Sequence, residues 1–196
     1  METGWNHNIH YHNLILKALP LKRNTALDIG CGEGLLLRQL SPLYHSITGI
    51  DANAQVITQA VEGNNNTNIQ FILGDVMDYT FPQNFDLVAS VATLHHLPLT
   101  DALIRFRGML NPGSVLVIIG LYKLHHIIDY IYAMFAMPLS RIFCVFKSYR
   151  TMIAPAQEPK LTLMEIKKQA EVLLPGCIIK RRLFFRYSLV WVNNAD

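Results

Sequence analysis

Three aspartates, each at or next to the end of a short apolar run, are the side chains whose spacing points most clearly to chemistry. Asp28 belongs to ALDIGCGEG (residues 26–34), Asp51 ends GID, and Asp75 lies in GDV. If the three runs are parallel strands, their carboxyl ends meet at one edge of a sheet and bring the three carboxylates to one rim. Each aspartate alone could be a turn former or a helix cap, but the three together favour a binding site.

The glycines after Asp28 indicate that a ligand lies against the main chain. Gly30, Gly32 and Gly34 can adopt positive φ angles and carry no Cβ atom. A tight strand–helix turn without a ligand is the alternative. Dinucleotide-binding loops have the different spacing G-x-G-x-x-G, and a carboxylate at Asp28 would repel their pyrophosphate. The sequence therefore favours a ligand with a cationic group near Asp28 and a ribose near Asp51.

The elements that must position these residues alternate along the first two thirds of the chain. The apolar runs predict strands at residues 25–29, 46–51, 69–73, 85–91 and 115–121. Helical patterns occur at 34–41, 53–62 and 101–110, with Asn53 and either Thr100 or Asp101 as N-caps and a turn at 111–114. Strands that are apolar on both faces and separated by amphipathic helices predict an α/β fold with a doubly wound parallel sheet.

The remaining parts of the chain are expected to complete a single domain over residues 1–196. They are a helical lead at 1–20, a helical insertion rich in aromatic residues and methionine at 123–160, a helix at 161–174 capped by Thr162, and two antiparallel strands within 177–185 and 188–192. The insertion is expected to be a lid that selects the substrate, or else an extra helix pair that packs on the core.

Composition and charge exclude several classes of protein. The chain is 51% hydrophobic and 16% charged, unlike a disordered chain, and its net charge of +3 includes a basic run at 180–182. We expect that run to be a solvated strand edge, so it implies no nucleic-acid partner. Three widely spaced cysteines give neither a disulfide framework nor a metal site. These features, and an N-terminus without the pattern of a signal peptide, suit a cytoplasmic protein.

One segment has the length of a membrane span. Residues 127–146 are largely apolar, but Asp129, Pro138 and Arg141 interrupt them. The uncharged runs between these residues are shorter than the ~20 residues that a spanning helix needs. We expect the segment to be buried or interfacial, which allows peripheral contact with a membrane but no span.

Five motifs in this order and spacing resemble the class I S-adenosylmethionine-dependent methyltransferases. They are LDIGCGEG, GIDAN, GDVMDYTF, FDLVASVATLHHL and LNPGSVLVI, which together cover about residues 24–122. The resemblance implies a Rossmann-like methyltransferase fold with seven strands, the last inserted antiparallel beside the fifth. It also implies S-adenosyl-L-methionine as the cofactor.

The resemblance further implies a role for individual residues. Those around the methionine portion would be Asp28, Gly30, Cys31, Gly32 and Gly34, with Asp28 facing the ammonium group. Those around the nucleoside would be Asp51 at the ribose hydroxyls, Ala52 beside the adenine, and Asp75 and Val76 at its polar edge. Those near the transferred methyl group would be Ser90, Val91 and His95, with Tyr11 closing over the cofactor.

Methyl transfer from a sulfonium is an in-line displacement that needs alignment, exclusion of water and, for a protonated acceptor, a base. His95 and His96 are the candidate bases, although they could instead cap a loop or contact the cofactor. SVATLHHLP replaces the Asn-Pro-Pro-Tyr-type motif of several nucleic-base methyltransferases, which favours a small, apolar or aromatic acceptor. The alternatives are a cofactor-binding protein without catalysis and an NAD-linked oxidoreductase.

Overall fold

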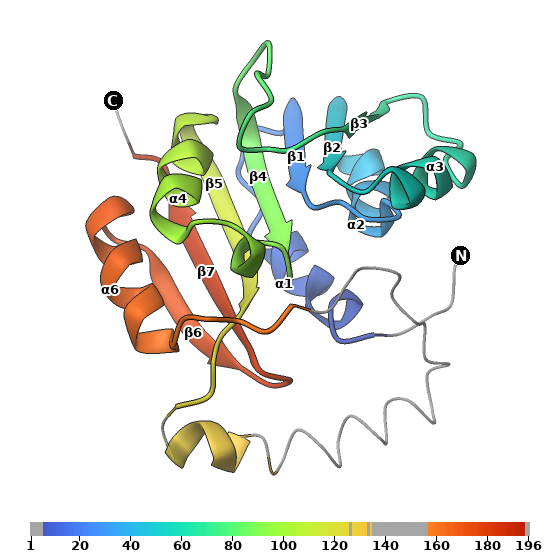
Figure 1. Ribbon diagram of the computed structural model, residues 1–196. Helices are drawn as coiled ribbons and strands as arrows, with labels where there is room; N and C mark the ends of the chain where they lie inside the picture. Colours follow the sequence, from blue (N-terminus) through green and yellow to red (C-terminus); the bar gives the residue numbers. More distant parts are fainter. Residues whose placement is uncertain (1–5, 126, 133, 135–156, 195–196) are drawn as a thin grey trace.

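Seven strands form one sheet in the computed structural model, which describes residues 6–125, 127–132, 134 and 157–194 (Figure 1). The strands are β1 (Thr25–Ile29), β2 (Ser46–Asp51), β3 (Ile69–Leu73), β4 (Phe85–Val91), β5 (Leu110–Leu121), β6 (Ile178–Arg182) and β7 (Arg186–Val192). Their order is β3-β2-β1-β4-β5-β7-β6, and β7 is antiparallel to both of its neighbours. The doubly wound sheet with an antiparallel strand beside the fifth is therefore confirmed.

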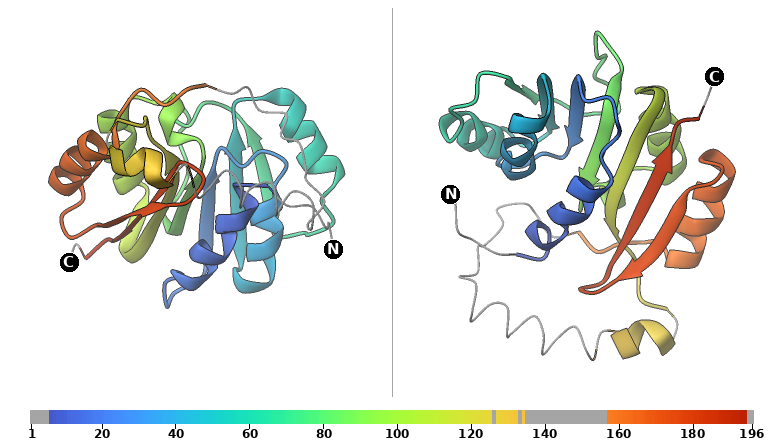
Figure 2. Two further views of the ribbon diagram at one scale, coloured as in Figure 1. Left: turned by 90° about the horizontal axis from the view of Figure 1, so that it is seen from below. Right: turned by 180° about the vertical axis from the view of Figure 1, so that it is seen from behind.

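Helices cover both faces of the sheet (Figure 2). They are η1 (Ile9–Tyr11), α1 (His12–Lys17), α2 (Leu35–Leu40), η2 (Ser41–Leu43), α3 (Ala54–Glu62), η3 (Leu94–His96), α4 (Leu99–Gly108) and α6 (Leu163–Leu173). Side chains of α4 and α6 share one buried cluster, and side chains of α1, α2 and α3 share the other. Two separate apolar clusters are what a sheet buried on both faces requires.

Two of the expected helix caps are present, and the third is not. The Asn53 side chain accepts a hydrogen bond from the Gln55 main-chain N–H (2.9 Å), and Thr162 forms a capping box with Glu165. The start expected at Thr100 or Asp101 is wrong, because α4 begins at Leu99 and is preceded by Pro98 without a side-chain cap.

The turn expected at residues 111–114 is instead part of β5. Gly113 has a φ of 75°, which allows the chain to bend within the strand. Its N–H donates to the Asn193 carbonyl (2.7 Å), and the Asn193 N–H donates to the Ser114 carbonyl (2.8 Å). The pairing that supports this irregular stretch comes from a residue about 80 positions away in the sequence, which local composition does not reveal.

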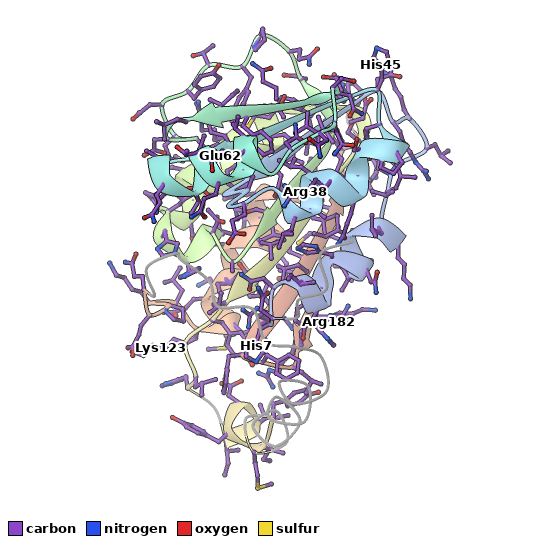
Figure 3. The ribbon with its side chains drawn as sticks, turned by 90° about the vertical axis from the view of Figure 1, so that its right-hand side faces the viewer. His7, Arg38, His45, Glu62, Lys123 and Arg182 are labelled. Atoms are coloured by element: carbon purple, nitrogen blue, oxygen red, sulfur yellow. The ribbon has the colours of Figure 1, made fainter. Side chains whose placement is uncertain are left out.

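The hairpin that joins β6 and β7 turns without glycine. Phe184 and Phe185 both have left-handed main-chain angles, with φ of 58° and 60°. The Phe184 ring is buried and lies 4.8 Å from the ring of His7, in the segment that precedes α1. The hydroxyl of Tyr11 donates to the Leu183 carbonyl (2.8 Å), so the turn also holds the segment around Tyr11 in place. Figure 3 shows His7 at the same end of the molecule as Arg182 and Lys123.

The basic run at 180–182 lies in the edge strand β6, but only part of it faces solvent. Lys180 is exposed, whereas Arg181 pairs with Asp129 (2.8 Å) and Arg182 donates to the Ser188 hydroxyl (2.9 Å).

Much of the expected insertion lies outside the described residues. The prediction that residues 127–146 do not span a membrane also falls largely on residues that the structure does not describe. Residues 127–132 are helical and follow β5 closely. In the described part of the chain, no helix has the length and apolar character to cross a bilayer.

Candidate functional site

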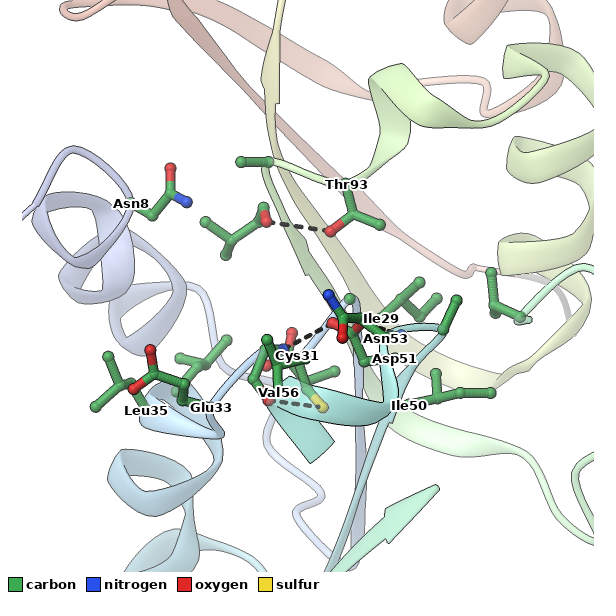
Figure 4. Close-up of a pocket in the computed structure, with 18 of the residues that line it drawn as sticks. Asn8, Ile29, Cys31, Glu33, Leu35, Ile50, Asp51, Asn53, Val56 and Thr93 are labelled. Atoms are coloured by element: carbon green, nitrogen blue, oxygen red, sulfur yellow. Dashed lines mark hydrogen bonds between the residues drawn. The ribbon is translucent and has the colours of Figure 1, made fainter. Parts of the chain in front are cut away.

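A cleft of about 770 Å³ lies along the carboxyl ends of β1, β2 and β4 (Figure 4). Ten of the residues expected at the site line it: Asp28, Gly30, Cys31, Gly32, Asp51, Ala52, Asp75, Val76, Val91 and His96. Four other expected residues, Tyr11, Gly34, Ser90 and His95, are not part of the lining. The fold thus brings the three aspartates to one shared cavity.

The glycine loop contains positions with different physical roles. Gly30 has a φ of 72°, and a Cβ added there would lie 1.9 Å from Thr93 Oγ1. Gly32 has a φ of 51°, but a Cβ there would meet nothing within 4 Å. Gly30 is therefore required by packing, whereas Gly32 leaves an open main-chain surface facing the cleft. Gly34 lies behind the loop, where it precedes α2 and packs against the ring of Phe71.

Asp51 links the glycine loop to the end of β2. Its Oδ2 accepts a hydrogen bond from the Gly32 N–H (2.9 Å), and its Oδ1 accepts one from the Asn53 N–H (2.9 Å). The N–H groups of Gly30 and Cys31 both donate to the Ile50 carbonyl, at 2.8 and 3.1 Å. The loop and the second strand are thus held as one rigid unit (Figure 4).

Asp28 is the least satisfied carboxylate of the cleft. Its side chain is only 3% exposed, and its Oδ1 atom has no hydrogen-bond partner among the described residues. Burial, followed by the negative charge of Asp51, raises the pKa of Asp28 to about 7. A buried carboxylate with an oxygen that no donor meets is unfavourable as an anion, and a cationic ligand group would stabilise it.

Cys31 lies in the same loop but is not a nucleophile. Burial, followed by the charges of Asp28 and Asp51, raises the pKa of its thiol far above the usual range. The residue therefore carries a neutral thiol that packs beneath the loop.

The loop after β3 forms the outer rim of the cleft. Asp75 is exposed, and its Oδ1 accepts a hydrogen bond from the Met77 N–H (2.8 Å). Val76 is buried, and its carbonyl accepts a hydrogen bond from the guanidinium of Arg105 in α4. Arg105 also donates to the Tyr79 carbonyl. One arginine therefore holds both ends of this loop in place.

The two histidines after β4 occupy different environments. Their ring centroids lie 4.0 Å apart with the ring planes tilted by 40°, but only His96 lines the cleft. His96 Nδ1 lies 2.7 Å from Gln157 Oε1. An amide oxygen can only accept, so this contact requires a hydrogen on Nδ1 and favours the neutral tautomer in which Nε2 keeps its lone pair. His95 is half-buried, and burial, followed by the charges of His96 and Arg186, lowers its pKa to about 4.

Ser90 is turned away from the cleft. It is fully buried, and its hydroxyl donates to the Ile29 carbonyl (3.2 Å), which joins β4 to β1. The next residues after β4 approach the cleft instead. Ala92 lines it with a φ of 54°, a strained conformation for a residue with a Cβ atom.

The N-terminal segment contributes lining residues that the sequence did not identify. Tyr11 points to the hairpin, where its hydroxyl donates to the Leu183 carbonyl, and it is not part of the cleft lining. The segment residues that do line the cleft are Asn6, Asn8, Ile9 and His12. His12 is buried, and burial lowers its pKa to about 4, so it faces the cleft as a neutral ring. The dense Asn and His pattern around Tyr11 was the available signal.

A second cavity of about 380 Å³ adjoins the cleft. It is lined by Leu94, His95, His96, Leu97, Pro98, Leu99, Leu121, Gln157, Pro159, Lys160, Leu161, Ile166 and Tyr187. His96 and Leu97 line both cavities, so they form the boundary between them. The second lining is mostly aliphatic, contains Lys160, and includes no carboxylate among the described residues.

The described residues offer no group of three His, Cys, Asp or Glu side chains that could hold a metal ion. Cys31 and Cys177 are free thiols, and Cys144 lies outside the described residues.

Comparisons with known proteins agree on one family. A methyltransferase domain model matches residues 26–113. An uncharacterized methyltransferase of Mycobacterium tuberculosis is 32% identical over 200 residues, covering 97% of this chain and 98% of that protein. A fatty-acid O-methyltransferase of Mycolicibacterium smegmatis is 32% identical over 110 residues, covering 53% of this chain and 39% of that protein.

A solved structure gives the same fold. The Haemonchus contortus phosphoethanolamine N-methyltransferase 2, in complex with phosphomonomethylethanolamine and S-adenosylhomocysteine, superposes with a TM-score of 0.62. It is 19% identical and covers 90% of this chain and 39% of that one. Because the sequence relatives and the matching domain are methyltransferases, the alternative of an NAD-linked oxidoreductase is wrong. By its sequence relatives, strand order and glycine loop, the chain belongs to the class I S-adenosylmethionine-dependent methyltransferases, with S-adenosyl-L-methionine as its cofactor.

Proposed function

We propose that this protein, as a single methyltransferase domain, transfers a methyl group to a small apolar acceptor held in the second cavity. The observation that carries the proposal is the aliphatic lining of that cavity and its boundary with the cofactor cleft at His96 and Leu97. The similarity to a fatty-acid O-methyltransferase over about half of the chain supports the same class of acceptor. Lys160 in the lining would favour an acceptor that carries a carboxylate.

The cofactor would lie in the cleft in one orientation. Asp28, the buried carboxylate without donors at Oδ1, would face the ammonium group of the methionine portion. Asp51 would accept from the ribose hydroxyls with the lone pairs that its two main-chain donors leave free. Asp75 and Val76 would bind the polar edge of the adenine, and the open surface at Gly32 would allow close approach of the ligand.

His96 is the residue that we assign as general base for a hydroxyl acceptor. S-adenosylmethionine supplies the activated methyl group, so the protein must align the acceptor and, where needed, remove its proton. The Nε2 lone pair of His96 is available because Gln157 binds the opposite nitrogen. His95 would not serve, because its lowered pKa makes it a weak base. A carboxylate acceptor would need no base at all.

A labelled-methyl transfer screen tests the proposal. The protein is incubated with radiolabelled S-adenosylmethionine and separate pools of fatty acids, phenols, quinols, tRNA and peptides. We expect label in an apolar small-molecule pool. Label only in tRNA or peptides would contradict the acceptor class. Binding of S-adenosylhomocysteine without transfer to any pool would instead favour a cofactor-binding protein without catalysis.

Matched histidine variants test the assignment of the base. For a phenolic acceptor, His96→Gln should lower kcat about 100-fold. His95→Gln, at the neighbouring ring, should keep kcat close to the wild-type value. For a carboxylate acceptor both variants should keep the wild-type kcat. Equal loss of kcat in both variants would contradict a specific role for His96.

A further inference from the structure

The helical residues after β5 turn their apolar side chains outward. In the stretch formed by residues 127–132 and 134, six large apolar side chains are between 38% and 81% exposed: Ile127, Ile128, Tyr130, Ile131, Tyr132 and Met134. We refer to these six residues as the apolar helix face. A helix on a globular protein normally shows the reverse pattern, with apolar residues inward and polar residues outward.

A buried ion pair fixes this reversed orientation. Asp129 is only 2% exposed, and its carboxylate lies 2.8 Å from Arg181 Nη2 in β6. The other carboxylate oxygen accepts a hydrogen bond from the His125 N–H (3.0 Å). The Arg181 guanidinium also lies 5.9 Å from the ring centroid of Tyr122 and 5.6 Å from that of Tyr132. Since the charged residue is held inward, the apolar residues on the other sides of the helix face solvent.

The helix that carries these residues lies at the end of the molecule where β6 turns into β7 (Figures 1 and 2). Phe185, on that turn, is also 37% exposed. Leu121 and Leu161, which stand on either side of this excursion of the chain, both line the second cavity. Leu121 precedes Ile127 by only six residues, so the apolar cavity and the apolar helix face are close to each other along the chain on this side.

The charge of this part of the sequence is positive. Residues 123–160 contain five basic residues, Lys123, Arg141, Lys147, Arg150 and Lys160, and two acidic residues, Asp129 and Glu158. Of these basic residues the structure describes Lys123 and Lys160, and both are exposed. The Lys123 N–H donates to the Leu161 carbonyl (2.8 Å), so the two lysines lie close together beside the start of the helix. Apolar and aromatic side chains flanked by basic residues suit the interface of an anionic bilayer.

We propose that the apolar helix face is a peripheral membrane-binding surface that inserts into the headgroup region of anionic phospholipid bilayers. Ile127, Ile131 and Met134 contribute the apolar contact, and the exposed Lys123 and Lys160 contribute the electrostatic attraction. Binding of this kind would place the enzyme where an apolar acceptor is concentrated. The proposal concerns a surface outside the cofactor cleft and needs no methyl transfer for its test.

Co-sedimentation with sucrose-loaded vesicles is the test. The full chain should bind vesicles of equimolar phosphatidylglycerol and phosphatidylcholine, and binding should weaken with added salt and be slight on pure phosphatidylcholine. The variant Ile127→Ser/Ile131→Ser should bind anionic vesicles about tenfold more weakly. The matched control Ile104→Ser/Val172→Ser changes exposed apolar residues of α4 and α6 and should bind like the wild type.

Three results would overturn the proposal. If a second copy of the chain covers the apolar helix face, sedimentation velocity will show a dimer that the Ile127/Ile131 variant dissociates, without vesicle binding. If another part of the same chain covers it, that variant will lower the melting temperature, again without vesicle binding. If the bound protein resists extraction with alkaline carbonate, it is inserted more deeply than a peripheral surface allows. Binding of S-adenosylhomocysteine by the same samples separates these results from failure of the proposed function.

Discussion

Two buried aspartates at opposite ends of neighbouring strands show how differently the two edges of the sheet are built. At the amino end, Asp86 of β4 accepts hydrogen bonds from the N–H groups of Asn24 (2.8 Å) and Thr25 (3.2 Å) and from the Asn111 amide (2.9 Å). Burial alone would raise its pKa, but these donors lower it overall. At the carboxyl end, Asp28 of β1 has an oxygen without a partner among the described residues, and its pKa is raised to about 7.

The difference separates a structural carboxylate from one that is kept for a ligand. Asp86 and Asp28 are nearly equally inaccessible to solvent, at 1% and 3% exposure, so exposure alone does not distinguish them. The number of donors does. Asp86 is stabilised as an anion by the protein itself, whereas the anion of Asp28 lacks such compensation until a cation binds. The amino edge of the sheet therefore contributes stability, and the carboxyl edge gives up stability for binding.

The largest expected effect is on stability at the amino edge. Asp86→Ala leaves three donors without their acceptor and should lower the free energy of unfolding by about 4 kcal/mol. Chemical denaturation at neutral pH measures the loss. Calorimetry on the folded variant should give an unchanged affinity for S-adenosylhomocysteine. A tenfold loss of that affinity would show that the two edges of the sheet are coupled. It would contradict the assignment of Asp86 to stability alone.

Asp28→Asn should have the opposite pattern. Loss of the charge that faces the ligand ammonium should weaken S-adenosylhomocysteine binding about 100-fold in calorimetry. The same variant should be more stable than the wild type at pH 8, by about 2 kcal/mol, because it removes an uncompensated buried charge. A variant that loses stability at this pH would show that the Asp28 anion already has sufficient donors in the empty protein.

The pH dependence gives the two carboxylates opposite signs. The pKa of Asp28 is raised in the folded protein, so its contribution to stability is present below about pH 4 and is lost as the pH rises towards 7. The pKa of Asp86 is lowered, so its contribution is present above about pH 4 and is lost as the pH falls through the lowered value. Unfolding measured from pH 3 to 8 for the wild type and both variants should separate these trends. Ligand affinity in the wild type should also fall below about pH 7, but not in Asp28→Asn.

A smaller effect is expected at the rim of the cleft. Arg105 holds the loop after β3 through the carbonyls of Val76 and Tyr79. Arg105→Ala should weaken S-adenosylhomocysteine binding about tenfold, because the loop that meets the adenine loses two charge-assisted hydrogen bonds. Arg107→Ala, on the same helix but bonded to the Leu173 carbonyl, is the matched control. Equal losses in the two variants would point to a general effect on α4.

The smallest effect is expected in the β6–β7 turn. Phe185→Gly should stabilise the protein by about 0.5–1 kcal/mol, since glycine adopts the left-handed conformation without strain and the Phe185 ring is partly exposed. Phe184→Gly relieves similar strain but removes a buried ring that packs on His7 and His10, so it should be destabilising. Thermal unfolding of both variants without lipid measures the contrast. If both variants are more stable than the wild type, main-chain strain alone controls the stability of the turn. If both are less stable, packing of the rings alone controls it.

The sequence by itself determined the parallel strands, the glycine loop and the three aspartates at one rim. These features have local causes: buried strands are continuous apolar runs, and the carboxyl ends of parallel strands share an edge. The cap at Asn53 and the capping box at Thr162 also depend on residues two or three positions apart. The resemblance to a family also depended only on the order and spacing of these motifs, and both can be read directly from the sequence.

Only the tertiary structure decided which individual side chains reach the site. Tyr11 turns to a hairpin carbonyl 172 residues away, and the roles of His95 and His96 separate because Gln157 meets one ring while burial affects the other. The missing donor at Asp28 and the inward direction of Asp129 likewise depend on neighbours from other elements. The direction, burial and partners of a side chain are set by contacts between residues far apart in the chain, and a linear pattern does not contain them.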